Sequence, residues 1–145
     1  MITIIVGSQT GTAEFVADDI LSLCQEQGLT AEVTLTTDHL TTTEPQTWLI
    51  CTSTHGAGEL PDNLKPFDAW LDRQQDLSKI NFLIIALGDT SYDTYCQAGF
   101  HLEKKLSAAN ANKLTETFTV DAMDEELPED LVIPWLTKIL ASTEI

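Results

Sequence analysis

Short, almost continuously apolar runs alternate along the chain with segments of helical spacing. The apolar runs are residues 2–6, 48–52 and 82–87. Strands of this kind are buried on both faces, as in the interior of a parallel sheet. Residues 31–35 are less apolar and read as a further strand. Residues 114–120 alternate apolar residues with threonine, which predicts an edge strand with one wetter face.

The intervening segments carry apolar residues at the spacing of an amphipathic helix. The three clearest sets are Val16, Ile20 and Leu23; Leu64, Phe67 and Leu71; and Leu102, Leu106 and Ala109. A last stripe contains Trp135, Leu136 and Ile139. We expect that helix to begin near Pro134, because proline is tolerated in a first turn. The acidic segment 121–130 before it is expected to be a loop.

This order of elements predicts an α/β fold: a doubly wound, five-stranded parallel sheet with helices on both faces. A chain of 145 residues has the size of one domain, so residues 1–145 are expected to form a single unit. Ligands of such sheets bind at the carboxyl ends of the strands, at the switch point. A site is therefore expected in the loops that follow the first, third and fourth strands.

Charge and composition exclude several classes of function. The formal net charge is −16, and no lysine or arginine precedes Lys65, which argues against nucleic acid or an anionic membrane as a partner. No apolar run approaches the roughly 20 residues that span a bilayer, and the N-terminus lacks the features of a signal peptide. A cytoplasmic protein is therefore expected. The three cysteines form no C-x-x-C motif, so we predict no metal, and Cys24 and Cys51 read as core residues.

Five of the seven glycines fall in the three loops where a site is expected: Gly7, Gly11, Gly56, Gly58 and Gly88. The first loop reads Gly7-Ser8-Gln9-Thr10-Gly11-Thr12-Ala13-Glu14. Its hydroxyls and the unpaired amides of a helix start would form a phosphate cradle. It has neither the lysine of a nucleoside triphosphate loop nor the G-x-G-x-x-G pattern. An ordinary helix capped by threonine remains the alternative.

The second and third loops add a long glycine-bearing segment and two tyrosines. The second reads Thr52-Ser53-Thr54-His55-Gly56-Ala57-Gly58-Glu59-Leu60-Pro61-Asp62-Asn63, and its length favours a function over a plain connection. The third reads Gly88-Asp89-Thr90-Ser91-Tyr92-Asp93-Thr94-Tyr95-Cys96. An aromatic ring at this edge can stack on a planar ligand. The alternative is that Tyr92 and Tyr95 merely pack the loop.

Taken together, the three loops resemble those of short-chain flavodoxins. The first loop is similar to the phosphate loop of the FMN domains of diflavin reductases. The motifs of the second and third loops are closer to the MioC-type flavodoxins. The resemblance covers essentially the whole chain and implies the strand order 2-1-3-4-5, FMN as the cofactor, and an electron carrier rather than an enzyme, without catalytic residues.

The resemblance also implies a role for each loop. The first would hold the phosphate, Ser53 and Thr54 would lie near the phosphate and the ribityl chain, and Tyr92 would stack on the outer face of the flavin. His55 stands where many flavodoxins carry an aromatic residue. The cofactor-binding set implied is Ser8, Gln9, Thr10, Gly11, Thr12, Ala13, Ser53, Thr54, His55, Gly56, Ala57, Gly58, Gly88, Asp89, Tyr92, Tyr95 and Cys96.

The partners implied are an NADPH-dependent flavoprotein reductase and acceptor enzymes with basic docking surfaces. MioC-type relatives suggest an acceptor in biotin synthesis. Acidic residues expected around the FMN end would steer these partners, and the negative charge favours a monomer: Glu14, Glu59, Asp62, Asp93, Asp124, Glu125 and Glu126. Two alternatives are a non-redox signalling or binding domain on the same fold, and an enzyme acting on a phosphorylated small molecule through His55 or Cys96.

Overall fold

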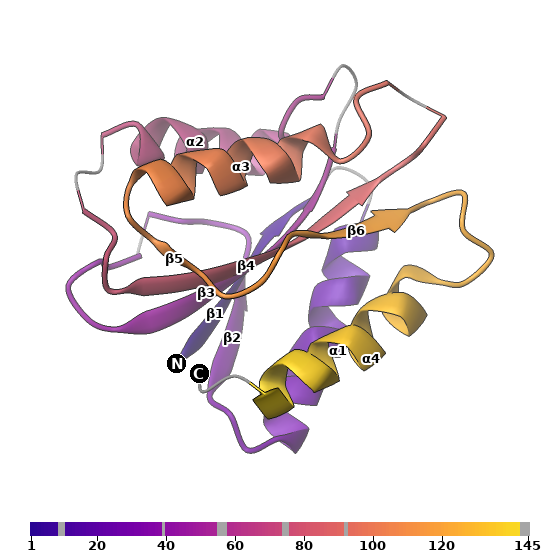
Figure 1. Cartoon of the computed structure of the whole chain (residues 1–145), viewed down its shortest axis with the longest axis horizontal. Coiled ribbons are helices and arrows are strands. Elements are labelled where there is room, and N and C mark those ends of the chain that lie inside the picture. Colours follow the sequence, from indigo (N-terminus) through magenta and orange to yellow (C-terminus); the bar gives the residue numbers. More distant parts are fainter. Residues whose placement is uncertain (9–10, 39, 55–57, 74–75, 92, 143–145) are drawn as a thin grey trace.

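The computed structural model describes residues 1–8, 11–38, 40–54, 58–73, 76–91 and 93–142. Strands and helices alternate along most of the chain (Figure 1). The elements are β1 (Ile2–Gly7), α1 (Thr12–Glu26), β2 (Ala31–Thr34), β3 (Gln46–Ser53), the 3₁₀ turn η1 (Asp62–Leu64), α2 (Lys65–Leu71), β4 (Ile80–Gly88), α3 (Gln97–Ala108), β5 (Asn112–Lys113), β6 (Phe118–Asp121) and α4 (Pro128–Ser142).

All strand pairs are parallel, and the sheet runs β2-β1-β3-β4-β5, with β6 also paired to β4. Helices α1 and α4 cover one face and α2 and α3 the other (Figure 1). This confirms the predicted doubly wound architecture and the strand order. The first four predicted strands correspond to β1, β2, β3 and β4. Each of these begins and ends within two residues of its predicted bounds.

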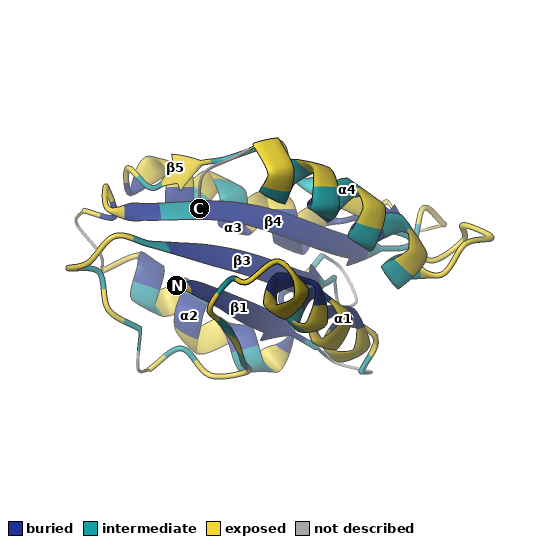
Figure 2. Cartoon of the chain, turned by 90° about the horizontal axis from the view of Figure 1, so that it is seen from below, coloured by how far each residue is buried: buried dark blue, intermediate teal, exposed yellow. Residues whose placement is uncertain are grey.

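The central strands are buried on both faces, and their side chains alternate between two cores. In β1, Ile4 and Val6 enter the core under α1 and α4, whereas Ile5 enters the core under α2 and α3. Strands β3 and β4 follow the same rule; Trp48 of β3, for example, packs edge-on against Phe67 of α2. Figure 2 shows the central strands β1, β3 and β4 mostly dark blue, whereas exposed residues lie on the outer sides of the helices, in the loops and in the edge strand β5.

The last strand is broken in two, contrary to the prediction of one strand over residues 114–120. Asn112 and Lys113 pair with the start of β4, and pairing resumes at Phe118 opposite Ile85. Residues 83–84 of β4 therefore lie opposite residues 114–117, so the chain has two residues more than the ladder can pair. The threonine alternation reports which side chains face the core, but it does not report whether each backbone group meets a partner.

Helix α4 begins at Pro128, six residues before the predicted start at Pro134, so the segment 121–130 is only partly a loop. The carbonyl of Leu127 accepts hydrogen bonds from the N–H groups of Asp130 and Leu131, which closes the first turn there. Pro128 occupies the first-turn position that favours proline. Val132 and Leu136 are fully buried in the core shared with α1. This burial holds the helix together through Pro134, although proline removes one helical hydrogen bond.

Cys24, Cys51 and Cys96 are buried free thiols, as the sequence predicts for the first two. Burial raises the pKa of Cys51 to about 12. None of the described helices is long and apolar enough to cross a membrane.

Replacing Pro134 with alanine is expected to stabilise the protein, because Pro134 lies inside α4 and is exposed. Proline costs about 3 kcal/mol relative to alanine within a helix, and about 1 kcal/mol of this is offset because proline also restricts the unfolded chain. Urea unfolding should show a gain of about 2 kcal/mol. Lys138→Ala, at an exposed site of the same helix, should stay within about 0.5 kcal/mol. An unchanged or lower stability of Pro134→Ala would place the helix start at Pro134 after all.

Candidate functional site

A pocket of about 320 Å³ opens at the carboxyl ends of the strands, where the three glycine-bearing loops meet. Figure 1 shows the ends of β1, β3, β4 and β6 gathered on this side of the molecule. The residues that line the pocket are Thr12, Ser53, Thr54, Leu87, Gly88, Asp89, Thr94, Tyr95, Cys96 and Ala122.

Residues of all three predicted loops therefore come together in one cavity. Thr12 lines it from the first loop, Ser53 and Thr54 from the second, and the rest of the predicted lining residues come from the third. Leu87, Thr94 and Ala122 also line the pocket, although the sequence did not single them out. Gln9, Thr10, His55, Gly56, Ala57 and Tyr92 lie outside the described residues, so their roles stay predictions.

The first loop is shaped by its own hydrogen bonds. The Ser8 hydroxyl accepts a hydrogen bond of 2.9 Å from the Gly11 N–H, and Gly11 has a φ of 92°, a conformation that favours glycine. The side chain of Ala13 is buried in the core, so only its backbone can face a ligand. The amides of Thr12, Ala13 and Glu14 belong to the first turn of α1, where the helix supplies no partner for them.

Asn63, at the start of the turn before α2, supports this loop and was missed as a site residue. Its amide oxygen accepts a 3.1 Å hydrogen bond from the Ser8 N–H, and its amide nitrogen donates to the carbonyls of Val6 and Leu35. It therefore ties the first loop to the ends of β1 and β2. The Asn63 side chain reaches residues 55 and 28 positions away, so no local pattern marks it.

The second loop is attached to β4 and α3 through Thr54. Its N–H donates to the Leu87 carbonyl at 3.1 Å, and its hydroxyl accepts from the Ala98 N–H at 3.4 Å. Thr54 thus satisfies an orphan amide at the start of α3, where no local side chain caps the helix. Gly58 lies against Gln97, and its φ of 97° again favours glycine.

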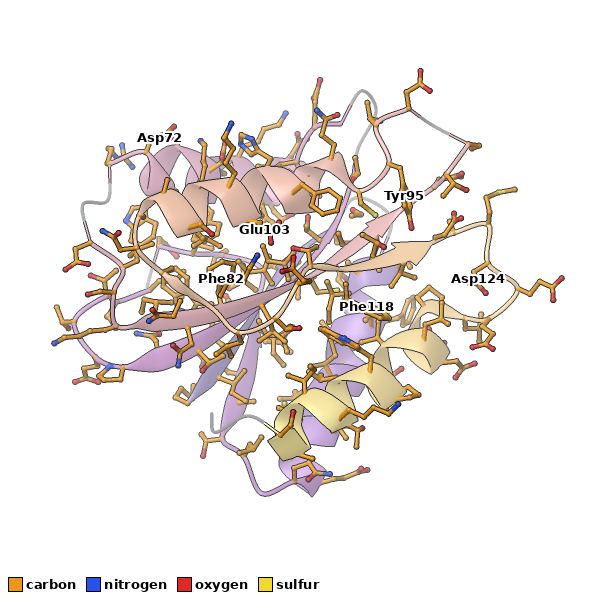
Figure 3. All side chains as sticks on the ribbon, in the orientation of Figure 1. Asp72, Phe82, Tyr95, Glu103, Phe118 and Asp124 are labelled. Atoms are coloured by element: carbon orange, nitrogen blue, oxygen red, sulfur yellow. The ribbon has the colours of Figure 1, made fainter. Side chains whose placement is uncertain are left out.

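The third loop packs so closely on itself that only glycine fits at position 88. A Cβ on Gly88 would lie 2.8 Å from the backbone nitrogen of Cys96 and 2.9 Å from the Tyr95 ring. The Asp89 carboxylate accepts hydrogen bonds from the N–H and hydroxyl of Ser91, so its side chain is engaged within its own loop. Tyr95 lies beside the ends of β4 and β6 (Figure 3).

Cys96 is held in place as a structural thiol. It has a φ of 55° at the start of α3, and its Sγ donates to the Ala86 carbonyl at 3.2 Å. Burial raises the pKa of the Cys96 thiol above its ordinary value, so the group is neutral at physiological pH and a poor nucleophile. The alternative of an enzyme that uses Cys96 loses its support here.

Asp121, the last residue of β6, joins the third loop to the loop that follows β6. Its carboxylate accepts hydrogen bonds from the Thr90 hydroxyl at 2.7 Å, the Thr90 N–H at 3.1 Å and the Met123 N–H at 2.9 Å. The Thr90 hydroxyl and the Met123 amide lower the pKa of Asp121 below its ordinary value of 3.8. Asp121 belongs to the acidic segment of the sequence, where nothing marks it as a residue that supports the site.

The lining of the pocket is chemically mixed. Thr12, Ser53 and Thr54 bring hydroxyls, and Leu87, Gly88 and Tyr95 bring apolar atoms and backbone groups. Such a cavity fits a ligand that carries both a phosphate and a flat ring. Among the described residues no group of His, Cys, Asp or Glu side chains could hold a metal ion.

The family model for flavodoxin matches residues 4–135. The chain belongs to the flavodoxin family. The MioC protein of Escherichia coli K12 is 40% identical over 93% of this chain and 92% of its own length. The structure of a cysteine-to-serine mutant of flavodoxin from Pseudomonas aeruginosa superposes with a TM-score of 0.87, at 33% identity, over 97% of this chain and 96% of that one.

A third relative is part of a larger protein. The sulfite reductase [NADPH] flavoprotein alpha-component of Thiocapsa roseopersicina is 34% identical to this chain. The match covers 78% of this chain and 22% of that relative. The family fixes the general activity: this flavodoxin binds FMN and carries electrons, without turning over a substrate of its own. The mixed lining of the pocket fits that cofactor. The isoalloxazine ring supplies the redox chemistry, while the protein binds and orients it.

Asp121→Asn is expected to destabilise the protein at neutral pH but not at low pH. The asparagine keeps one acceptor oxygen, but its amide nitrogen cannot accept the Thr90 hydroxyl. Because the folded pKa of Asp121 is lowered, its contribution is present above pH 3.8 and is lost as the pH falls through the folded value. The free energy of unfolding in urea should therefore be lower for the variant than for the wild type at neutral pH. This difference should shrink at about pH 3. Glu125→Gln, at an exposed carboxylate of the next loop, serves as the control, and an equal gap at both pH values would contradict the prediction.

Proposed function

We propose that residues 1–145 act as one FMN-binding domain that accepts electrons singly from an NADPH-dependent flavoprotein reductase and passes them to acceptor enzymes. The observation that carries the proposal is the pocket itself, in a chain of the flavodoxin family. Its lining offers hydroxyls from the first and second loops, and its third loop packs so closely on itself that a Cβ on Gly88 would displace Cys96 or Tyr95.

The proposal assigns the phosphate to the first loop and the ring to the third. Ser8, Thr10 and Thr12 would form the phosphate cradle together with the nearby amides of residues 9–13, while Ser53 and Thr54 would contact the phosphate and ribityl chain. The backbone of Asp89 and Cys96 would bind the polar edge of the ring, with Gly88 and Tyr95 beside it. Tyr92 as the stacking residue, and the segment from His55 to Gly58 on the inner face, complete the proposed site.

The partners are proposed from the relatives. The similarity to a flavoprotein component of an NADPH-dependent reductase supports a donor that delivers electrons through flavin. The similarity to MioC proteins makes an acceptor enzyme of biotin synthesis the first to test. We propose a monomer, because a net charge of −16 opposes self-association. We also propose that the protein is cytoplasmic.

Long-range attraction would bring such partners to the pocket. The acidic residues assigned to this role are all exposed, although Glu59 and Asp62 share Lys65 as a partner: Glu14, Glu59, Asp62, Asp93, Asp124, Glu125 and Glu126. Exposed charges raise the rate of encounter more than they stabilise the complex. At about 0.1 M salt, attraction between exposed charges more than about 10 Å apart is largely screened.

The first test is a visible spectrum of the protein with FMN, followed through stepwise reduction. We expect shifted flavin bands on binding and two separate one-electron steps.

With an NADPH-dependent flavoprotein reductase as donor, kcat/KM should fall roughly tenfold or more between about 20 mM and about 500 mM salt. A rate that does not change with salt would exclude electrostatic steering, and an unperturbed FMN spectrum would exclude the function.

Gly88→Ala should weaken FMN binding. The added methyl group would displace the backbone of Cys96 or the ring of Tyr95. Overpacking of this kind costs about 1–3 kcal/mol, and a loss of that size in binding raises the dissociation constant roughly fivefold to 150-fold. Fluorescence titration with FMN measures this directly. Gly28→Ala is the control for a methyl group added to a glycine elsewhere, because a Cβ on Gly28 would meet nothing within 4 Å and Gly28 does not line the pocket. Equal FMN affinities for the two variants would remove Gly88 from the site.

A further inference from the structure

A second pocket, of about 350 Å³, lies beside α2 at a place where the fold omits a helix. The connections that follow β1, β3 and β4 contain α1, α2 and α3. Residues 35–45 instead connect β2 to β3 past β1, and the described part of this segment contains no helix (Figure 1). A loop covers less of a neighbouring helix than another helix would, so part of the α2 surface lines an open pocket. Its volume lies within the range of small-molecule sites, roughly 300–1,000 Å³.

One wall of this second pocket is a single side of α2 and the turn after it. Pro66, Trp70 and Arg73 line the pocket and stand at the i, i+4, i+7 spacing of one helix face. The half-buried Trp70 ring stacks on Phe67 with 5.9 Å between the ring centroids, and it tilts against Trp48 at 6.0 Å. The Arg73 N–H donates to the Trp70 carbonyl at 3.0 Å. This wall is therefore fixed by the core before any ligand arrives.

The opposite wall is the loop between β2 and β3, and hydrogen bonds fix it as well. Asn63 lines the pocket from the turn before α2 and donates to the Leu35 carbonyl at 3.1 Å. The Thr34 hydroxyl donates to the Thr36 carbonyl at 2.7 Å and accepts from the Thr36 N–H at 3.2 Å. The lining residues from this loop are Thr36, Thr37 and Asp38. The pocket is thus preformed on both sides, as small-molecule sites usually are.

The lining combines an aromatic ring, a guanidinium group, a carboxylate and hydroxyls. Arg73 is the only arginine of the chain. Its planar fork carries five N–H donors, so it can bind a phosphate while it keeps a protein partner. An aromatic ring such as that of Trp70 stacks on any nucleobase. A carboxylate such as that of Asp38 accepts hydrogen bonds from ribose hydroxyls. Together these groups complement the three parts of a nucleotide.

We propose that this second pocket binds a nucleoside monophosphate. The base stacks on Trp70, the ribose hydroxyls donate to Asp38, and the phosphate binds Arg73. The two pockets have no lining residue in common, so this site is separate from the one assigned to FMN. The proposal goes beyond the electron-carrier function and does not rest on it.

Calorimetric titration of the FMN-loaded protein with AMP tests the proposal, because FMN then fills the first pocket. Salt of about 0.15 M screens the repulsion between AMP and the anionic protein. We expect saturable binding of one AMP per chain. Adenosine lacks the phosphate and ribose 5-phosphate lacks the base, and each should bind roughly tenfold or more weakly than AMP.

Two variants separate the contributions of the base and the phosphate. Arg73→Gln should weaken AMP binding about tenfold and leave adenosine binding unchanged. Trp70→Leu should weaken both about tenfold. Lys138→Gln is the matched control for the lost charge, because it removes one exposed cation from α4, and it should stay within about twofold of the wild type. FMN affinity should be unchanged in Arg73→Gln.

The absence of saturable AMP binding below about 1 mM would overturn the proposal. Equal AMP affinities of Arg73→Gln and Lys138→Gln would remove the phosphate from Arg73. If Trp70→Leu fails to fold, the comparison of AMP with ribose 5-phosphate still decides the stacking, and equal affinities for these two would exclude it. If the chain did not bind FMN, the same titrations on the free protein would still decide the site, because Arg73 does not line the first pocket.

Discussion

Burial of β1, β3 and β4 on both faces is the constraint on which the rest of this structure depends. Side chains of β1 alternate between two cores, with Ile4 on one side and Ile5 on the other, and both are fully buried. A sheet of this kind needs helices on each face, which parallel strands obtain through right-handed crossovers. The crossovers leave the carboxyl ends of the strands, and so the three glycine-bearing loops that follow β1, β3 and β4, at the same edge. The position of the pocket is thus a consequence of how the hydrophobic core is divided.

The loops at this edge are joined to one another by polar side chains rather than by the sheet. Asn63 ties the first loop to two strand ends, Thr54 joins the second loop to α3, and Asp121 joins the third loop to the loop after β6. Each of these contacts satisfies a backbone group that would otherwise lack a partner. These contacts hold the loops in one arrangement around the pocket, and Gly88 lies where the third loop packs most closely on itself. The shape of the pocket therefore depends on side chains such as Asn63 and Asp121, which do not line it.

The two sides of the sheet differ in how their carboxylates are paired. Lysines of α2, α3 and β5 neutralise carboxylates on one side of the sheet, and those of α1 and of residues 122–130 stand unpaired among the described residues. The potential around unpaired carboxylates is negative. A negative potential at a bound cofactor opposes the addition of a second electron to it.

The sequence by itself predicted the alternating strands and helices, a doubly wound sheet covered on both faces, and three converging loops. These features follow from local periodicity within short segments, as with Ile2 to Val6. The strand order and the flavodoxin family came from the resemblance of the loop motifs, as with Gly88 to Cys96. Only the tertiary structure decided where the last strand breaks, where α4 begins and which side chains support the loops. The break depends on the register against β4, and the early start of α4 depends on burial of Val132 against α1. Asn63 and Asp121 reach partners 55 and 31 residues away, and such contacts exist only once the sheet has assembled.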